Sequence, residues 1–174
     1  MRVLVTGGLG FLGRAVTLEL RGHGYDVHVL TRRRGDVEVP DGVRVVRVDL
    51  RDRDEVRRAL RGGGYQAVCH LAALTRVRDS FADPLAYYEV NLGGTLHLLQ
   101  ALPDSVRFVY TSSNSVYGTQ TGRLTEDIPP SPTSPYAASK LRRRAGDRLP
   151  RGHRRAGCGD AAVLQHRGSR RRYR

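Results

Sequence analysis

The chain has 174 residues, enough for one domain with a sizeable core, and no apolar run long enough for a signal peptide or a membrane-spanning helix. Its formal net charge of +13 is uneven: residues 1–140 hold 18 basic and 15 acidic residues, whereas residues 141–174 hold 12 basic and two acidic residues. The basic character therefore belongs to the C-terminal part, which argues against a nucleic-acid-binding domain. Cys69 and Cys158 suit neither a disulfide framework nor a metal site, so we expect a cytoplasmic protein without bound metal.

Three glycines dominate the N-terminal part of the sequence. A predicted strand over residues 3–6 runs into Gly7, Gly10 and Gly13, and a helical pattern follows over residues 12–21. The expected apolar face of this helix consists of Ala15, Val16, Leu18 and Leu20. A strand, a glycine-rich turn and a helix start place backbone N–H groups at a helix N-terminus, which predicts a dinucleotide phosphate site. A tight turn without a ligand is the alternative.

Strands and helices alternate along the rest of the sequence. Further strands are predicted over residues 26–30, 43–48, 67–71 and 106–111, and helices over 52–60 and within 80–102. This order predicts an α/β fold with a doubly wound parallel sheet of the Rossmann type. We expect His70 to be a core residue and Asn91 to bridge the long helix to a strand end. The expected buried side of that helix consists of Leu92, Leu96, Leu98 and Leu99.

The ends of the second and third strands bear on which dinucleotide binds. An acidic residue at the end of the second strand binds the ribose hydroxyls of NAD, but Thr31 stands there, followed by Arg32 and Arg33. Guanidinium groups suit a 2′-phosphate, so the sequence favours NADP over NAD; a solvated basic loop is the alternative. Asp49 can accept the adenine amino group or cap the next helix.

A tyrosine and the chain's one lysine stand four residues apart. Tyr136 and Lys140 share a face if this segment is helical, and they follow the serine-rich end of the fifth strand, which includes Ser113. A phenol with an ordinary pKa of about 10 is a poor base at neutral pH. A nearby ammonium and a positively charged nicotinamide favour the phenolate, and a serine hydroxyl can hold a reacting oxygen. This constellation predicts acid–base chemistry beside a nicotinamide.

The sequence resembles the extended short-chain dehydrogenase/reductase family, the NAD(P)-dependent epimerases and dehydratases of nucleotide sugars. The matching segments are residues 6–13, Asp49-Leu50, His70-Leu71-Ala72-Ala73, residues 91–95, residues 112–118 and Tyr136 to Lys140. Residues 83–88 and 113–118 most resemble UDP-glucose 4-epimerases. The resemblance covers residues 1–141, which we expect to form the dinucleotide-binding domain.

The resemblance implies roles for individual residues. Tyr136 is the implied acid/base, Lys140 holds the nicotinamide ribose, and Ser113 binds the reacting oxygen of a nucleotide sugar. The implied cofactor contacts are Gly7, Gly10, Phe11, Leu12, Gly13, Thr31, Arg32, Asp49, Leu50, Leu71, Ala72, Ala73, Tyr136 and Lys140. Two departures weaken the assignment to NAD-using epimerases: Thr31 replaces the usual acid, and Thr75 replaces a lysine often found near the cofactor. Full-length members of the family often form homodimers.

The resemblance ends in an arginine-rich tail, residues 142–174. Family members continue with a further strand, an R-x-F-N-x-x-G motif and a C-terminal substrate domain, none of which is visible here. The tail has few apolar residues, and we expect it to be disordered or aberrant. Codons for residues 147–168 can be chosen so that a shift of one nucleotide reads TAYHAATGALGAVTLRCFNIAG, which contains the missing motif. We therefore expect a frameshifted, truncated protein with weak cofactor binding and no turnover.

The sequence leaves two other functions open. One is a non-catalytic NAD(P)-binding sensor or interaction protein, against which the intact set of Ser113, Tyr136 and Lys140 argues. The other, less favoured, is nucleic-acid binding through the basic tail, which lacks interleaved aromatic residues and any known module.

Overall fold

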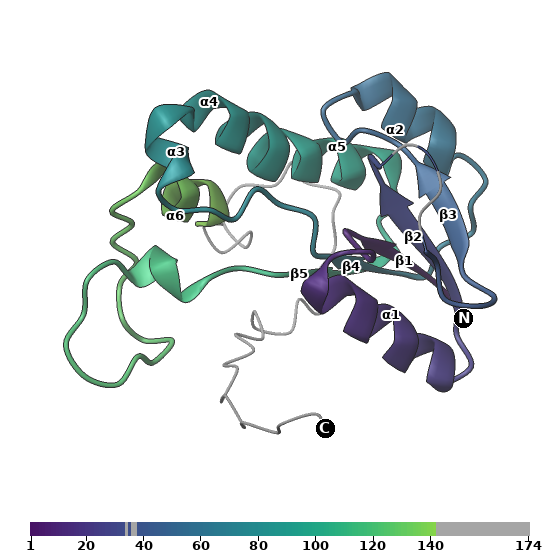
Figure 1. Cartoon of the computed structure of the whole chain (residues 1–174), viewed down its shortest axis with the longest axis horizontal. Helices are drawn as coiled ribbons and strands as arrows, with labels where there is room; N and C mark the ends of the chain where they lie inside the picture. The colour runs from purple at the N-terminus through teal and green to yellow at the C-terminus, as the bar shows by residue number, and fades with distance from the viewer. Residues whose placement is uncertain (34, 36–37, 142–174) are drawn as a thin grey trace.

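A parallel β-sheet forms the centre of the molecule (Figure 1). The computed structural model describes residues 1–33, 35 and 38–141. The strands in this part of the chain are β1 (Arg2–Thr6), β2 (Asp26–Thr31), β3 (Arg44–Arg47), β4 (Ala67–His70) and β5 (Arg107–Tyr110). They lie in the order β3-β2-β1-β4-β5, and every pairing between them is parallel. The predicted doubly wound, Rossmann-type sheet is confirmed.

The connections between the strands contain the helices. These are α1 (Phe11–Gly22), α2 (Arg53–Leu60), α3 (Asp79–Ala82), α4 (Pro84–Tyr87), α5 (Gly94–Ala101) and α6 (Pro135–Lys140), with a π-helical segment η1 (Tyr88–Gly93) and a 3₁₀ turn η2 (Asn114–Tyr117). Segments α4, η1 and α5 follow one another directly, so the predicted long helix exists with a π-helical turn inside it. No helix within the described ranges could cross a membrane. The cytoplasmic location stays a prediction.

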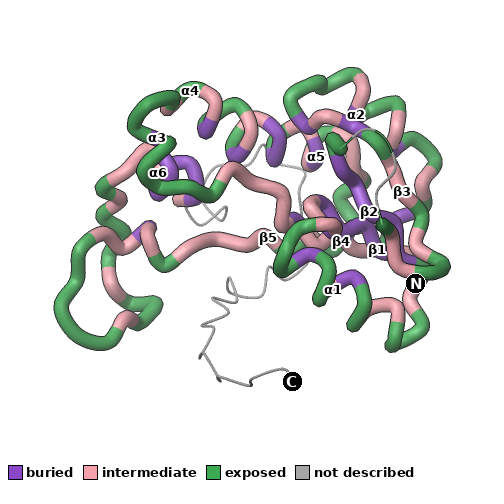
Figure 2. Tube along the Cα trace, viewed as in Figure 1, coloured by how far each residue is buried: buried purple, intermediate pink, exposed green. Residues whose placement is uncertain are grey.

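Alternate residues of the central strands face opposite layers of the molecule. Val3, Val5, Val27 and Val29 form one buried cluster, against which Val16 and Leu20 of α1 pack. Leu4, Leu30 and Val68 belong to a second cluster, together with Val56 of α2 and Leu98 of α5. Helix α1 thus covers one face of the sheet, and α2 and α5 cover the other (Figures 1 and 2).

The buried side of α1 is smaller than its sequence predicts. Leu18 is 49% exposed and Ala15 is also exposed, whereas Gly13 and Thr17 are buried. The reason is close packing: a Cβ added at Gly8 would meet the Val29 side chain and the Thr17 hydroxyl within 3 Å. A helix that approaches a strand turn so closely has room only for small side chains on its inner face.

The long helix also turns an unexpected side toward the core. Leu92 and Leu96, which we predicted to be buried, are 48% and 44% exposed. The buried positions are Tyr87, Asn91, Gly94, Thr95 and Leu98. Gly94 must be small because an added Cβ would lie 2.9 Å from the Cβ of Leu50. The inner side therefore consists largely of polar and small residues, and an apolar stripe faces outward.

Candidate functional site

The carboxyl ends of the strands surround a cavity of about 530 Å³. Such a volume lies within the range of small-molecule sites, and strand carboxyl ends are where open α/β sheets bind ligands. Every residue implied by the resemblance as a cofactor contact lines this cavity: Gly7, Gly10, Phe11, Leu12, Gly13, Thr31, Arg32, Asp49, Leu50, Leu71, Ala72, Ala73, Tyr136 and Lys140. The structure thus brings together residues that lie up to 133 positions apart in the sequence. Their part in binding a cofactor stays a prediction.

Backbone geometry defines the glycine turn at one end of the cavity. Gly7 has a φ of +70°, and a Cβ there would lie 2.9 Å from the Ala72 amide nitrogen. A Cβ at Gly13 would collide with the Gly7 carbonyl oxygen and lie 2.7 Å from the Gly8 Cα. Both positions therefore require glycine, because any side chain would push the turn away from its neighbours.

The first turn of α1 is open to an anion. Gly10 is the N-cap and provides no side-chain cap to the helix, while its own N–H donates to the Gly7 carbonyl at 2.9 Å. The first backbone N–H groups of an α-helix have no acceptor within the helix. Phe11, Leu12 and Gly13, which carry these groups, line the cavity. The turn therefore has the chemistry that a pyrophosphate requires.

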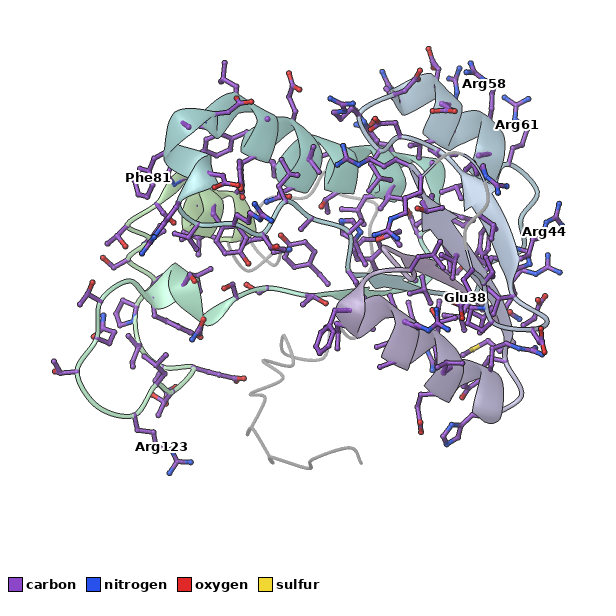
Figure 3. The ribbon with its side chains drawn as sticks, viewed as in Figure 1. Glu38, Arg44, Arg58, Arg61, Phe81 and Arg123 are labelled. Atoms are coloured by element: carbon purple, nitrogen blue, oxygen red, sulfur yellow. The ribbon has the colours of Figure 1, made fainter. Side chains whose placement is uncertain are left out.

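Arginine side chains flank the end of β2. Thr31 is buried, and its Oγ1 accepts a hydrogen bond from the Arg33 N–H at 3.1 Å. Arg32 and Arg33 are exposed and line the cavity. Glu38 in the following loop (Figure 3) does not lie free, because its carboxylate is 2.6 Å from the Arg14 guanidinium on α1. That ion pair holds the pKa of Glu38 below its ordinary value.

The structure decides one of the alternatives for Asp49. Helix α2 is capped by Asp52, whose carboxylate accepts from the Glu55 N–H at 2.8 Å, so Asp49 is not the cap. The Asp49 carboxylate accepts instead from Arg51, at 2.7 Å from Nη2 and 3.1 Å from Nε. This hydrogen bonding lowers the pKa of Asp49. Asp49 is therefore an anionic acceptor at the rim of the cavity, and its contact with adenine stays a prediction.

Helix α6 carries the tyrosine and the lysine at the other end of the cavity. Ser134 caps this helix by accepting from the Ala137 N–H at 3.0 Å. Tyr136 is 8% exposed and Lys140 is 3% exposed. The Lys140 Nζ lies 4.5 Å from the ring centroid of Tyr110. Burial disfavours the ammonium and lowers the pKa of Lys140 to about 8.

The predicted serine lies apart from the cavity wall. The Ser113 hydroxyl donates to Ser115 Oγ at 3.1 Å and accepts from the Ser115 N–H at 3.2 Å. Among described residues, the cavity lining includes Thr111 and Ser112 but not Ser113. Ser112 donates from its Oγ to the Lys140 carbonyl at 3.1 Å, which ties the end of β5 to α6. The sequence assigns no site role to Thr111 and Ser112, although they directly precede Ser113.

The predicted structural roles of His70 and Asn91 are confirmed. His70 is 1% exposed, with Nδ1 2.6 Å from Thr6 Oγ1 and Nε2 2.8 Å from Thr95 Oγ1. Asn91 bonds both backbone groups of Leu74, at 2.8 Å and 3.0 Å. Leu74 follows β4, so Asn91 bridges the long helix to a strand end as expected. Within residues 1–33, 35 and 38–141, no cluster of three His, Cys, Asp or Glu side chains could hold a metal ion.

The comparisons with known proteins agree with this geometry. Residues 3–164 match the NAD dependent epimerase/dehydratase family, and the chain belongs to that family. The match runs past Leu141, where we expected the resemblance to end. The UDP-glucose 4-epimerase of Streptomyces lividans is 38% identical over 149 residues, which cover 80% of this chain and 44% of that protein.

Solved structures show the same relationship. The UDP-glucose 4-epimerase of Thermus thermophilus in complex with NAD is 44% identical with a TM-score of 0.74, over 80% of this chain and 47% of that one. A dTDP-glucose 4,6-dehydratase of Streptomyces venezuelae with NAD bound is 38% identical with a TM-score of 0.70, over 80% and 48%. The chain thus spans about half the length of each of these three relatives.

Proposed function

We propose that the chain is the dinucleotide-binding part of an epimerase or dehydratase of nucleotide sugars, of the UDP-glucose 4-epimerase type. The observation that supports this most is that the glycine turn and the Tyr136–Lys140 pair line one cavity. The glycine turn suits the pyrophosphate, because Gly7 and Gly13 leave no space for side chains and the first turn of α1 lacks a side-chain cap. A sensor that does no chemistry has no use for the tyrosine and the lysine.

The proposed chemistry moves one proton and one hydride. When bound, a nicotinamide would supply the hydride chemistry, by removing a hydride from a carbon of the sugar and returning it. Tyr136, as its phenolate, takes the proton of the hydroxyl on that carbon, so that the C–O bond becomes a carbonyl. Lys140 binds the nicotinamide ribose. Ser113 holds the reacting oxygen once its hydroxyl leaves Ser115.

The proposal also concerns which dinucleotide binds, NAD or NADP. The solved relatives named above hold NAD. For this chain we propose a preference for NADP, because Thr31 carries no negative charge and Arg32 and Arg33 line the cavity beside it. Fluorescence titration is expected to give a dissociation constant about tenfold lower for NADPH than for NADH, about 1.4 kcal/mol.

An arginine variant tests the cause of that preference. Arg33→Ala is expected to abolish the difference between the two dinucleotides and to leave the affinity for NADH unchanged. Arg58→Ala is the matched control, because Arg58 points outward from α2, away from α6 (Figure 3). Equal loss of affinity for both dinucleotides in Arg33→Ala would contradict a 2′-phosphate contact.

The role of Tyr136 has its own test. Tyr136→Phe removes only the phenolic oxygen, so dinucleotide binding is expected to stay within twofold of the parent chain, about 0.4 kcal/mol. Interconversion of UDP-glucose and UDP-galactose, measured in the protein with its in-frame continuation restored, should disappear in this variant. A large loss of NADPH affinity in Tyr136→Phe would instead assign the hydroxyl to binding.

The tail beyond Leu141 lies outside the described residues. We propose that its coding region contains a one-nucleotide frameshift, that the in-frame continuation encodes the R-x-F-N-x-x-G motif, and that the 174-residue chain alone does not turn over a nucleotide sugar. Sequencing the DNA that encodes residues 138–150 and the region downstream tests this. A shifted frame that does not continue into family-like sequence contradicts it, as does robust epimerase activity of the purified chain.

The exposed apolar stripe supports a further part of the proposal. It consists of Phe81, Leu85, Tyr88, Leu92 and Leu96, which succeed one another at helical spacing along α3, α4, η1 and α5. Phe81 points outward from α3 in Figure 3. We propose that a second copy of the chain covers this stripe, as in the homodimers expected from the resemblance. Sedimentation equilibrium of the parent and of Leu85→Glu tests it, with a monomeric parent as the contradicting result.

A further inference from the structure

A series of buried polar side chains runs beneath the cavity from β1 to α6. Its members are Thr6, His70, Thr95, Asn91 and Ser139, none of them more than 4% exposed. They come from β1, β4, α5, η1 and α6, so the series leads from two neighbouring strands to the helix that carries Tyr136. Buried polar groups of this kind fix the elements they join, because an unsatisfied donor or acceptor costs about 1–3 kcal/mol.

The donors and acceptors along this series follow from the Thr95 hydroxyl, which has a single proton to donate. Thr95 donates its hydroxyl proton to the backbone carbonyl of Asn91 at 2.6 Å, so toward His70 Nε2 it can only accept. His70 therefore carries its proton on Nε2. Its neutral Nδ1 then accepts from the Thr6 hydroxyl at 2.6 Å, and that hydroxyl oxygen in turn accepts from the Ala72 N–H at 3.1 Å. Each hydrogen bond from Ala72 to Asn91 therefore has its donor on the Ala72 side and its acceptor on the Asn91 side.

The series ends at the tyrosine. Asn91 Nδ2 donates to Ser139 Oγ at 2.9 Å, and Ser139 Oγ donates to the backbone carbonyl of Tyr136 at 2.7 Å. At its beginning the series holds Ala72, the residue that a Cβ on Gly7 would strike. One end is thus attached to the wall behind the glycine turn, and the other to the first turn of α6.

We propose that Thr95 and His70 are positioning residues: through Asn91 and Ser139 they set where Tyr136 stands relative to the glycine-turn wall. A catalytic role for this position of Tyr136 rests on the proposed function, whereas the position itself does not. The π-helical turn η1 contains Asn91, which bonds both Leu74 and Ser139 from this one position. π-Helical turns occur frequently at functional sites.

The test reads Tyr136 directly. In protein labelled with [¹³Cζ]tyrosine, the Tyr136 resonance is identified by its disappearance in Tyr136→Phe. Thr95→Val keeps the shape of the side chain but removes the hydroxyl, and it is expected to displace the Tyr136 resonance. Thr95→Ser keeps the hydroxyl and is expected to leave the resonance at its parent position. A resonance that is unmoved in folded Thr95→Val overturns the proposal.

A matched control separates positioning from general destabilisation. Thr17 is equally buried, and its hydroxyl donates to the Gly8 carbonyl at 3.4 Å, outside the series. Thr17→Val is expected to leave the Tyr136 resonance in place, and a displacement as large as in Thr95→Val overturns the proposal. Should Thr95→Val fail to fold, Ser139→Ala breaks the last link, and the same displacement is expected there; its absence overturns the proposal.

Two further readouts distinguish this inference from the proposed function. Imidazole ¹⁵N shifts are expected to show the Nε2–H tautomer of His70 in the parent, and the Nδ1–H tautomer would overturn the proposal. NADPH affinity is expected to fall about tenfold in Thr95→Val, because Lys140 lies on the same helix as Tyr136 and is displaced with it. A parent chain that binds no dinucleotide contradicts the proposed function while the resonance test still decides the inference. A displaced resonance with unchanged affinity contradicts the link between placement and binding.

Discussion

The two ends of the cavity are built by different means. At the glycine turn, shape comes from the backbone: Gly7 needs its positive φ, and Gly13 lies where any side chain would strike the turn. At α6, shape comes from buried side chains, with Tyr136 and Lys140 enclosed and a series of polar groups beneath them. Added side-chain volume should therefore lower stability at the glycine turn, whereas changes in charge and hydrogen bonding should alter stability at α6.

The largest effect is expected at the backbone end. Gly13→Ala places a Cβ against the Gly7 carbonyl, and we expect it to lower the free energy of unfolding by about 3 kcal/mol. Gly22→Ala in the same helix is the control, because a Cβ there meets nothing within 4 Å, and a gain of about 0.5 kcal/mol is expected. Urea unfolding measures both. Similar values for the two variants would contradict the steric explanation.

The next effect belongs to the side-chain end and depends on pH. Because burial lowers the pKa of Lys140 to about 8, below its unfolded value of 10.5, the protonated lysine destabilises the fold, and this cost is full below pH 8. This cost disappears as the pH rises from about 8 to 10.5. Lys140→Met is therefore expected to raise the free energy of unfolding by about 2 kcal/mol at pH 7.

The pH dependence sharpens the contrast. The advantage of Lys140→Met should shrink between pH 8 and pH 10, whereas the penalty of Gly13→Ala should be the same at both values. Since Lys140 is the one lysine of the chain, no other lysine contributes to this change. An advantage that persists unchanged at pH 10 would show that packing rather than charge is responsible.

The smallest effect concerns a single hydrogen bond behind Tyr136. Tyr87 is buried, donates from its hydroxyl to the Arg76 carbonyl at 2.5 Å and meets the Tyr136 ring edge-on, with centroids 6.3 Å apart. Tyr87→Phe keeps the ring contact and loses the bond, so a loss of about 1 kcal/mol is expected in urea unfolding. Tyr25→Phe, at a position whose hydroxyl bonds to no described residue, should change stability by less than about 0.5 kcal/mol. Equal losses would refute the assignment.

The sheet and the backbone end of the site could be predicted from the sequence. Strand and helix periods alternate clearly, and Gly7, Gly10 and Gly13 occur where a strand gives way to a helix. Asn91 was also predictable, since a buried amide in mid-helix requires partners. In each case the physical requirement is local, or concerns a single residue type, so that one sequence suffices to reveal it.

How the helices and strands pack against one another could not be predicted from the sequence. The prediction that Leu92 and Leu96 are buried is wrong because it assumes that the apolar side of a helix faces the core. Here the core side is filled by Asn91 and Thr95, whose polar groups are satisfied by partners on other elements. Likewise, which of Ser112 and Ser113 lines the cavity depends on how the chain turns after β5.

The solitary lysine makes this chain a convenient subject for covalent footprinting. An amine-directed acylating reagent has two kinds of target here, the α-amino group of Met1 and the ε-amino group of Lys140. Burial lowers the pKa of Lys140 to about 8, which favours the unprotonated, nucleophilic amine, yet only 3% of the residue is exposed. The rate of its acylation, normalised to that of the N-terminus, therefore reports how often α6 and the cavity wall separate.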